Sequence, residues 1–199
     1  MTDKPGDQQQ AEQYSLLLAE LRKLKTDYQK LSELVHTDSL TGLYNYRHFV
    51  GAIEQEMERS RRTQQPMILV MLDYDRFKEV NDNWGHSNGN RALILLASCL
   101  RNNLRKLDIA CRYGGEEFAI ILPNTTLETG VHVAERLRES VESTPLVLED
   151  YQSITLTISL GVALYEGEPE ETSERLINIA DTQLYRAKRA GRNCLRYKS

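Results

Sequence analysis

The first regular pattern of apolar residues in this chain is a seven-residue repeat near the N-terminus. Its positions alternate in steps of three and four and are occupied by Tyr14, Leu17, Leu21, Leu24, Tyr28, Leu31 and Val35. Such a narrow apolar seam is typical of the a and d positions of a parallel coiled coil. We therefore predict a dimerisation helix over residues 11–36, preceded by a disordered polar segment over residues 1–10. The alternative is an amphipathic helix that packs on its own domain.

Beyond this repeat, the apolar pattern alternates between helical and extended spacing and predicts one domain over residues 37–199. Helices are predicted where apolar residues recur every three or four positions, with Ser173 as the N-cap of the last helix. These segments are residues 47–61, 88–105, 126–143 and 173–190. Strands are predicted at short apolar or alternating runs. These segments are residues 67–73, 108–112, 117–122, 154–160 and 194–198.

The order of these elements predicts a mixed central sheet flanked by helices, in the α/β (α+β) class. Residues 77–86 fall between two predicted elements. Taken alone, they have the composition of a polar loop with buried Phe77 and Trp84.

Composition narrows the functional classes. The net charge of −4 argues against a general basic surface for nucleic acid. The three cysteines, Cys99, Cys111 and Cys194, lack metal-ligand spacing and are typical of reduced thiols in a cytoplasmic protein. No apolar run is long enough to span a membrane, and no signal-peptide pattern is present. We therefore expect a soluble protein of the cytoplasm.

Carboxylates gather at two predicted strand ends. One apolar run ends in Asp73-Tyr74-Asp75, and the glycine pair Gly114-Gly115 is followed at once by Glu116-Glu117. If these strands are neighbours, they supply the hard oxygen ligands that Mg²⁺ prefers, with positions left for water and phosphate. Asp73 and Asp75 are expected to share a face, whereas the two glutamates point apart. The alternative is that each acid is a solvated turn residue.

Basic and polar side chains accompany these acids. Lys78 follows the first strand end closely, where an ammonium group can offset charge on a transferring phosphate. Asn81 offers both a donor and an acceptor to a base edge. Lys188 lies in the last turn of a predicted helix, and Arg192 lies just past its glycine stop. These two cations suit a triphosphate, or alternatively they serve only as ordinary partners of the helix C-terminus.

Together these stretches resemble the GGDEF family of bacterial diguanylate cyclases. The landmarks occur in the family's order, and the signature hairpin Arg112–Phe118 is present as a GGEEF variant. The matching segments are Asp38–Asn45, Leu72–Lys78, Asn81–Asp82, Gly85–His86, Arg112–Phe118 and Gly191–Asn193. The resemblance implies a fold akin to nucleotidyl cyclase and polymerase palm domains. It also implies that two GTP molecules are joined into cyclic di-GMP, with release of two pyrophosphates.

The resemblance further implies roles for individual residues. Asp73, the Tyr74 carbonyl, Glu116 and Glu117 would hold Mg²⁺ or Mn²⁺. Glu116 would help to deprotonate the attacking 3′-hydroxyl, Glu117 would support the metal site, and Lys78 would stabilise the transition state. The implied substrate-binding residues are Phe77, Lys78, Asn81, His86, Asn90, Lys188 and Arg192.

The same resemblance implies a two-protomer site. Each protomer of the family carries one GTP, so each active site needs two domains that face each other. A parallel coiled coil would raise the effective concentration of the second domain in such a homodimer. Arg105 and Asp108 resemble the family's inhibitory product site, where the alternative is a surface ion pair at a helix end.

Two positions depart from the family's pattern. Asn90 stands where an aspartate commonly reads guanine, and an amide offers one acceptor and one donor, a pair that also suits adenine. Tyr46 replaces an arginine that is common after Asn45, and it lies outside the chemistry. Three functions therefore stay open. They are a GTP-specific diguanylate cyclase, a synthase that also uses ATP to make cyclic GMP-AMP, and a catalytically silent receptor for cyclic di-GMP.

Overall fold

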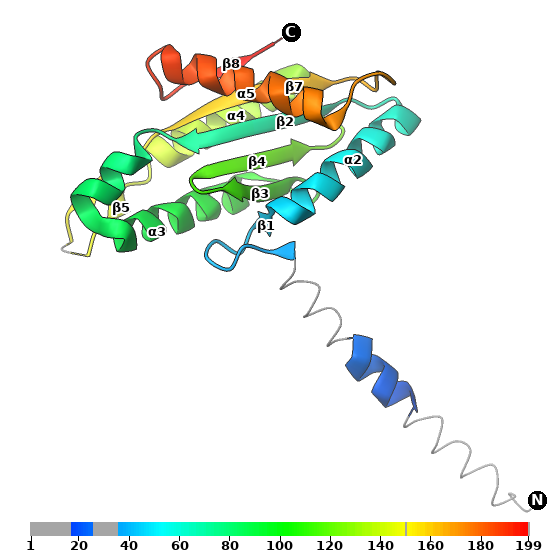
Figure 1. The fold of residues 1–199 in the computed structure, drawn as a ribbon, viewed down its shortest axis with the longest axis horizontal. Coiled ribbons are helices and arrows are strands. Elements are labelled where there is room, and N and C mark those ends of the chain that lie inside the picture. Colours follow the sequence, from blue (N-terminus) through cyan, green and yellow to red (C-terminus); the bar gives the residue numbers. More distant parts are fainter. Residues whose placement is uncertain (1–16, 26–35, 150, 199) are drawn as a thin grey trace, which may run out of the picture. The chain divides into compact units, whose positions relative to one another are not determined.

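The computed structural model describes residues 17–25, 36–149 and 151–198 and divides the chain into two units, Met1–Thr37 and Asp38–Ser199 (Figure 1). In the first unit residues 17–25 are helical, as predicted. The heptad leucines of this segment, Leu17, Leu21 and Leu24, are exposed in the single chain. Residues 1–10 and most of the remaining heptad lie outside the described residues. Pairing of this helix with a second copy therefore stays a prediction.

The second unit is built on a sheet that has six strands within the described residues, in the order β1-β3-β4-β2-β7-β8. The pairs at its two edges, β1 with β3 and β7 with β8, are parallel, and the inner pairs are antiparallel. The predicted mixed sheet is therefore confirmed. Its strands are β1 Tyr44–Asn45, β2 Met67–Tyr74, β3 Ile109–Gly114, β4 Glu117–Leu122, β7 Ile158–Tyr165 and β8 Leu195–Tyr197. A small separate hairpin pairs β5 Leu146–Val147 with β6 Ser153–Ile154.

Helices cover both faces of this sheet (Figure 1). They are α2 Tyr46–Thr63, α3 Phe77–Asn103, α4 Leu127–Glu142 and α5 Ser173–Arg189. The central strand β2 is buried throughout, and its side chains alternate between the two layers. Leu69 and Met71 pack with α2 and α5, whereas Ile68 and Val70 pack with α3 and α4. Its C-terminal residues are therefore held rigidly between two cores.

Two strand and helix boundaries differ from the predictions. The alternating run predicted as a strand over residues 154–160 divides, because Ile154 pairs with Leu146 in the small hairpin and β7 begins only at Ile158. Two polar residues of that run, Thr157 and Ser159, hydrogen-bond Asp75, as described below, whereas Thr155 is exposed. The N-cap of α5 is Thr172, whose hydroxyl accepts from the backbone N–H of Arg175, and not Ser173.

Residues 77–84, which alone have the composition of a polar loop, form the first turns of α3. This helix is interrupted at Gly85, which has φ 77° and ψ 161°. Phe77 is buried as expected, whereas Trp84 is 36% exposed. The interruption folds the segment before Gly85 back toward the segment after it, and this arrangement shapes part of the site. Among the described residues, no helix combines the length and apolar content that crossing a bilayer requires.

Candidate active site

The predicted acids meet where β2 runs alongside the signature hairpin. Asp73 lies directly opposite Glu117 in the antiparallel pairing of β2 with β4, so both side chains leave the same face of the sheet. Asp73 is only 5% exposed. Burial raises the pKa of Asp73 to about 6, Lys188 opposes that rise, and the negative charges of Glu116 and Glu117 add to it. The fold thus concentrates negative charge at one point.

The tip of the hairpin is braced by Arg112. Gly115 has φ 49°, a conformation that favours glycine, and its carbonyl accepts from Arg112 Nε at 2.9 Å. Arg112 Nη1 also lies 3.1 Å from Asp38 Oδ2. Burial alone would raise the pKa of Asp38, but hydrogen bonds from Thr41 and the charge of Arg112 hold it below its usual value. Sequence analysis placed Asp38 and Arg112 in separate motifs and did not predict this link between them.

Asp75 has a structural role. Its carboxylate accepts from the hydroxyl of Thr157 at 2.7 Å, the hydroxyl of Ser159 at 2.6 Å and the backbone N–H of Asn193 at 2.9 Å. Asp75 therefore joins the end of β2 to β7 and to the turn after α5. The polar positions of the alternating run over residues 154–160 were the sequence signal for this partner.

Lys188 reaches the acids from the last turn of α5. Its Nζ lies 3.0 Å from Asp73 Oδ2. Carboxylates of Asp73 and the signature hairpin, with the backbone carbonyl of Tyr74, are the hard oxygen donors that suit Mg²⁺. In the described part of the chain, however, no three metal-ligating side chains are gathered as a ready-made cluster. The donor chemistry fits a divalent ion, and Lys188 supplies the positive charge beside Asp73 in this arrangement.

The interruption at Gly85 creates a close contact across α3. A Cβ atom at Gly89 would lie 2.0 Å from Asn81 Oδ1 and 3.5 Å from Phe77 Cζ, so a larger residue there would displace the Asn81 side chain. Phe77, Asn81 and Gly89 are therefore brought together. Asn90 follows directly and is exposed, as is His86 after the interruption.

The two remaining predicted phosphate ligands, Lys78 and Arg192, stand on different elements. Lys78 is exposed in the first turn of α3. Arg192 stands in the turn after α5 with φ 65°, and its N–H donates to the carbonyl of Ala187 at 3.2 Å. Arg192 also lines a cavity of about 270 Å³ beside α3, whereas Lys188 points to Asp73. The structure thus brings Lys188 to the acids and directs Arg192 to a neighbouring space.

Arg105 and Asp108 form a closed turn between α3 and β3. The N–H of Arg105 donates to Asp108 Oδ2 at 2.7 Å, and the N–H of Asp108 donates to the carbonyl of Arg105 at 3.1 Å. Burial raises the pKa of Asp108, while Arg105 and Arg136 counteract that rise. Arg136 belongs to α4 and is anchored to the carbonyl of Asn103 at 2.7 Å. Its part in this cluster was not predicted, because it depends on how α4 packs beside α3.

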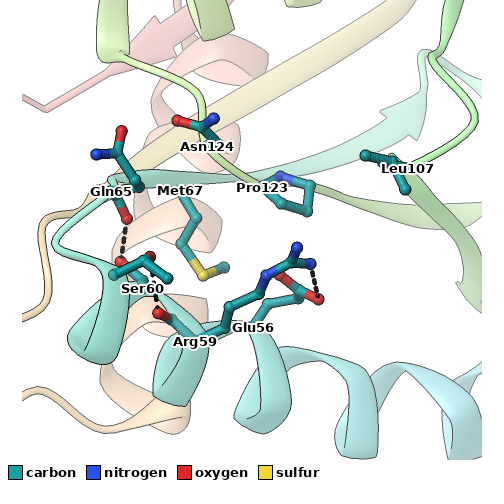
Figure 2. A pocket seen from close by; sticks show the side chains of 9 residues that line it. Glu56, Arg59, Ser60, Gln65, Met67, Leu107, Pro123 and Asn124 are labelled. Carbon is teal, nitrogen blue, oxygen red and sulfur yellow. Dashed lines mark hydrogen bonds and ion pairs between the residues drawn. The ribbon is translucent and has the colours of Figure 1, made fainter.

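Another cavity, of about 180 Å³, lies at the opposite end of β2, beside Met67 (Figure 2). An ion pair of 3.5 Å between Glu56 and Arg59 lies in its wall. Leu107, from the Arg105–Asp108 turn, also lines it and is 72% exposed. Met67 and Asp73 stand near opposite ends of the eight-residue strand β2, so this cavity is roughly 20 Å from the acids. It is therefore separate from the acidic site.

A mixed sheet covered on both faces, with carboxylates at the end of its central strand and on the adjoining hairpin, defines an α/β domain with an acidic site. The family model described as "Diguanylate cyclase, GGDEF domain" matches residues 35–194. This chain belongs to the GGDEF family.

Named relatives agree with this assignment. The chain is 39% identical over 180 residues to the response regulator PleD of Caulobacter vibrioides, covering 87% of this chain and 39% of PleD. It is 40% identical over 159 residues to the diguanylate cyclase DosC of Escherichia coli K12, covering 80% of this chain and 34% of DosC. The chain thus spans well under half the length of these relatives.

Solved structures share the fold. The diguanylate cyclase SiaD of Pseudomonas aeruginosa, solved with its activator SiaC, matches with a TM-score of 0.80 and 36% identity over 97% of this chain and 77% of SiaD. The coiled coil and GGDEF domain of DgcB from Caulobacter crescentus, solved with c-di-GMP, matches with a TM-score of 0.86 and 28% identity. That match covers 94% of this chain and 98% of the DgcB chain.

Proposed function

We propose that this chain is a diguanylate cyclase that condenses two GTP molecules into cyclic di-GMP and releases two pyrophosphates. The observation that carries the proposal is that Asp73, at the end of β2, is paired with Lys188 and feels the negative charges of both signature glutamates. Such a site combines oxygen ligands for a divalent ion with a cation for phosphate. Membership of the GGDEF family and the intact signature hairpin support the same chemistry.

In the proposed mechanism, Asp73, the Tyr74 carbonyl, Glu116 and Glu117 would hold Mg²⁺ or Mn²⁺, which when bound offsets charge on the phosphates. The 3′-oxygen of one GTP attacks the α-phosphorus of the other. The bond between that phosphorus and the oxygen bridging to the β-phosphate breaks, and pyrophosphate leaves with the bonding electrons. Glu116 receives the proton of the 3′-hydroxyl.

The basic side chains bind and orient the substrate. Lys78, exposed at the start of α3, stabilises the charge that develops on the transferring phosphate. Lys188 and Arg192 hold the remaining phosphates. For Lys188 this role requires its ammonium to exchange Asp73 for a phosphate when nucleotide and metal enter. Before the substrate binds, Lys188 thus partly offsets the negative charge of Asp73.

The nucleoside contacts the surface around the interruption of α3. Phe77 and Asn81, packed against Gly89, supply an apolar contact and an amide, and His86 and Asn90 stand at the rim. Because one protomer holds one GTP, two protomers must face each other to join two nucleotides. We propose that the heptad helix brings them together as a homodimer. The DgcB relative, solved with a coiled coil beside its GGDEF domain, supports this arrangement.

Product restrains the enzyme at the Arg105–Asp108 turn. An arginine fork can bind a guanine edge or a phosphate, and Asp108 can accept from guanine. Arg136 adds a second cation on α4 beside Asp108. The DgcB structure, which contains c-di-GMP, supports product binding by domains of this kind.

A second candidate function is a synthase that also accepts ATP, which the exposed amide of Asn90 favours. The deciding experiment incubates the protein with Mg²⁺ and GTP, ATP or their mixture and identifies the cyclic products by mass. Cyclic di-GMP as the main product supports the first proposal, and a large fraction of cyclic GMP-AMP supports the second. Asn90→Asp, which restores two acceptors, should shift the products toward cyclic di-GMP. Absence of pyrophosphate release under all conditions would instead indicate a silent receptor.

A further inference from the structure

A cavity of about 270 Å³ lies between the first turns of α3, residues 154–157 and the turn 191–193. Arg76 and Arg192 are among its lining residues, whereas Phe77 and Asn81 are not. The latter two are four residues apart and share a face of the helix that is turned to Gly89. The cavity therefore adjoins the proposed nucleoside contact but occupies a neighbouring face of the same helix.

The Arg192 wall of the cavity is fixed in place. The N–H of Arg192 donates to the carbonyl of Ala187 at 3.2 Å, which ties the turn to the end of α5. The side chain of the next residue, Asn193, bridges Arg138 at 2.9 Å and Glu142 at 2.8 Å on α4. These bonds place the wall four residues beyond Lys188, which reaches the catalytic acids. The cavity is thus a preformed space next to the place where phosphates are expected.

Two arginines, Arg76 and Arg192, and two acids, Asp75 and Glu79, line this cavity, and both acids are already engaged by protein groups. The carboxylate of Asp75, although part of the lining, accepts hydrogen bonds from Thr157, Ser159 and the backbone of Asn193, so protein donors already offset its charge. Arg76 makes only a long, exposed ion pair of 3.6 Å with Glu79. Such a pair contributes little and is readily exchanged. A multiply charged anion can therefore displace Glu79 from Arg76 and bind both arginines of the lining.

We propose that this cavity is a pyrophosphate subsite, in which Arg76 joins Arg192 in holding the leaving group after each bond is formed. The proposal rests on the proposed cyclase function, because pyrophosphate is its second product. Pyrophosphate carries phosphate oxygens at both ends, and the planar forks of two arginines suit such a ligand. Transfer of the leaving group to Arg76 draws it away from Lys188. The ammonium of Lys188 is then free to pair again with Asp73.

The direct test titrates sodium pyrophosphate into the full chain in metal-chelating, nucleotide-free buffer and follows binding by calorimetry. Loss of one charge-assisted contact in Arg76→Gln should weaken binding roughly fivefold, and Glu79→Gln should strengthen it. Arg62→Gln is the matched control, because Arg62 makes a similarly exposed ion pair of 3.7 Å with Glu58 on α2. Equal affinities of wild type and Arg76→Gln, or no binding by wild type, would overturn the subsite.

A second measurement separates this subsite from ordinary substrate binding. Pyrophosphate is added to the cyclase assay, and its inhibition constant is compared with the KM for GTP. The subsite predicts that Arg76→Gln raises the inhibition constant more than the KM. Equal changes in both constants would make Arg76 a simple substrate contact and refute the proposal. Because the calorimetric titration contains no GTP, a failure to form cyclic product would count against the proposed function and leave the subsite measurement readable.

Discussion

Lys188 Nζ lies 3.0 Å from Asp73 Oδ2, so α5 supplies a cation to a carboxylate that is only 5% exposed at the end of the central strand. Asp73 also feels the negative charges of Glu116 and Glu117. A buried carboxylate close to two other negative charges needs a positive partner. Lys188 meets this need in the free domain, and a divalent ion would meet it in the loaded site.

This relationship predicts competition between Lys188 and metal for Asp73. In Lys188→Met, binding of Mn²⁺ to nucleotide-free protein at pH 7.5 should become several-fold tighter, because the internal cation no longer opposes the ion. Electron paramagnetic resonance of free Mn²⁺ measures the change directly. Arg189→Met is the matched control, since Arg189 lies over the ring of Tyr185 on the outside of the same helix. Equal or weaker Mn²⁺ binding by Lys188→Met would contradict the competition.

Asp73 should also reduce the stability of the domain at neutral pH. Its folded pKa of about 6 lies above the ordinary value of 3.8. Its contribution to stability is therefore fully present below pH 3.8 and lost as the pH rises through about 6. The neutral variant Asp73→Asn should stabilise the metal-free domain at pH 7.5 by about 2 kcal/mol while abolishing turnover.

Urea unfolding at pH 7.5 and pH 5 tests this prediction. The advantage of Asp73→Asn should shrink at the lower pH, because wild-type Asp73 is then mostly protonated in the folded state. Asp82→Asn, a change at an exposed acid of α3, serves as the control and should alter stability little at either pH. A stabilisation that stays constant between the two pH values would show that the pKa of Asp73 is not its cause.

Arg112 should hold the tip of the signature hairpin in the position that catalysis requires. Its guanidinium group joins the carbonyl of Gly115 to Asp38. A lysine has one ammonium group and no planar fork, so it cannot bond both partners in this geometry. Arg112→Lys and Asp38→Asn should each lower kcat, by roughly tenfold for the former, with a smaller change in the KM for GTP. The double variant should lose less than the sum of the two single losses, because both break one linkage. If the losses in activation free energy, calculated from the kcat values, were strictly additive, the two residues would not share a role.

Much of the fold followed from local patterns. The apolar runs located β2, the hairpin and three of the four long helices of the described domain to within a few residues. The patterns failed where tertiary contacts decide. The break at Gly85 and the contact of Asn81 with Gly89 form because the first part of α3 folds back on the second. The buried polar residue Ser159 is explained by its hydrogen bond to Asp75. Similarly, the ion pair of Lys188 with Asp73 joins residues far apart in the sequence, so the sequence predicted two separate roles for them.

Product inhibition should depend on the turn between α3 and β3. Arg105→Ala is expected to remove most inhibition by cyclic di-GMP, since the remaining carboxylate of Asp108 would lack its cationic neighbour in the turn. Lys106→Ala changes an exposed cation of the same turn and should leave inhibition intact. Initial rates are measured over a range of added product. Equal inhibition of wild type and Arg105→Ala would refute the assignment.

The predicted coiled coil makes the rate depend on how two domains meet. Deleting residues 1–35 removes the heptad and leaves the compact unit Asp38–Ser199 intact. In the full chain, a tethered partner keeps the effective concentration of the second domain high, in the millimolar range for short linkers. The truncated protein must instead associate from bulk solution, so its specific activity should fall as it is diluted, while that of the full chain changes far less. Identical dilution curves would exclude the heptad from assembly of the site.

Because a misfolded truncation would also be inactive, its thermal unfolding is measured in parallel. Recovery of activity at high protein concentration would then show that the truncated domain folds and that only its association with a second domain is weakened.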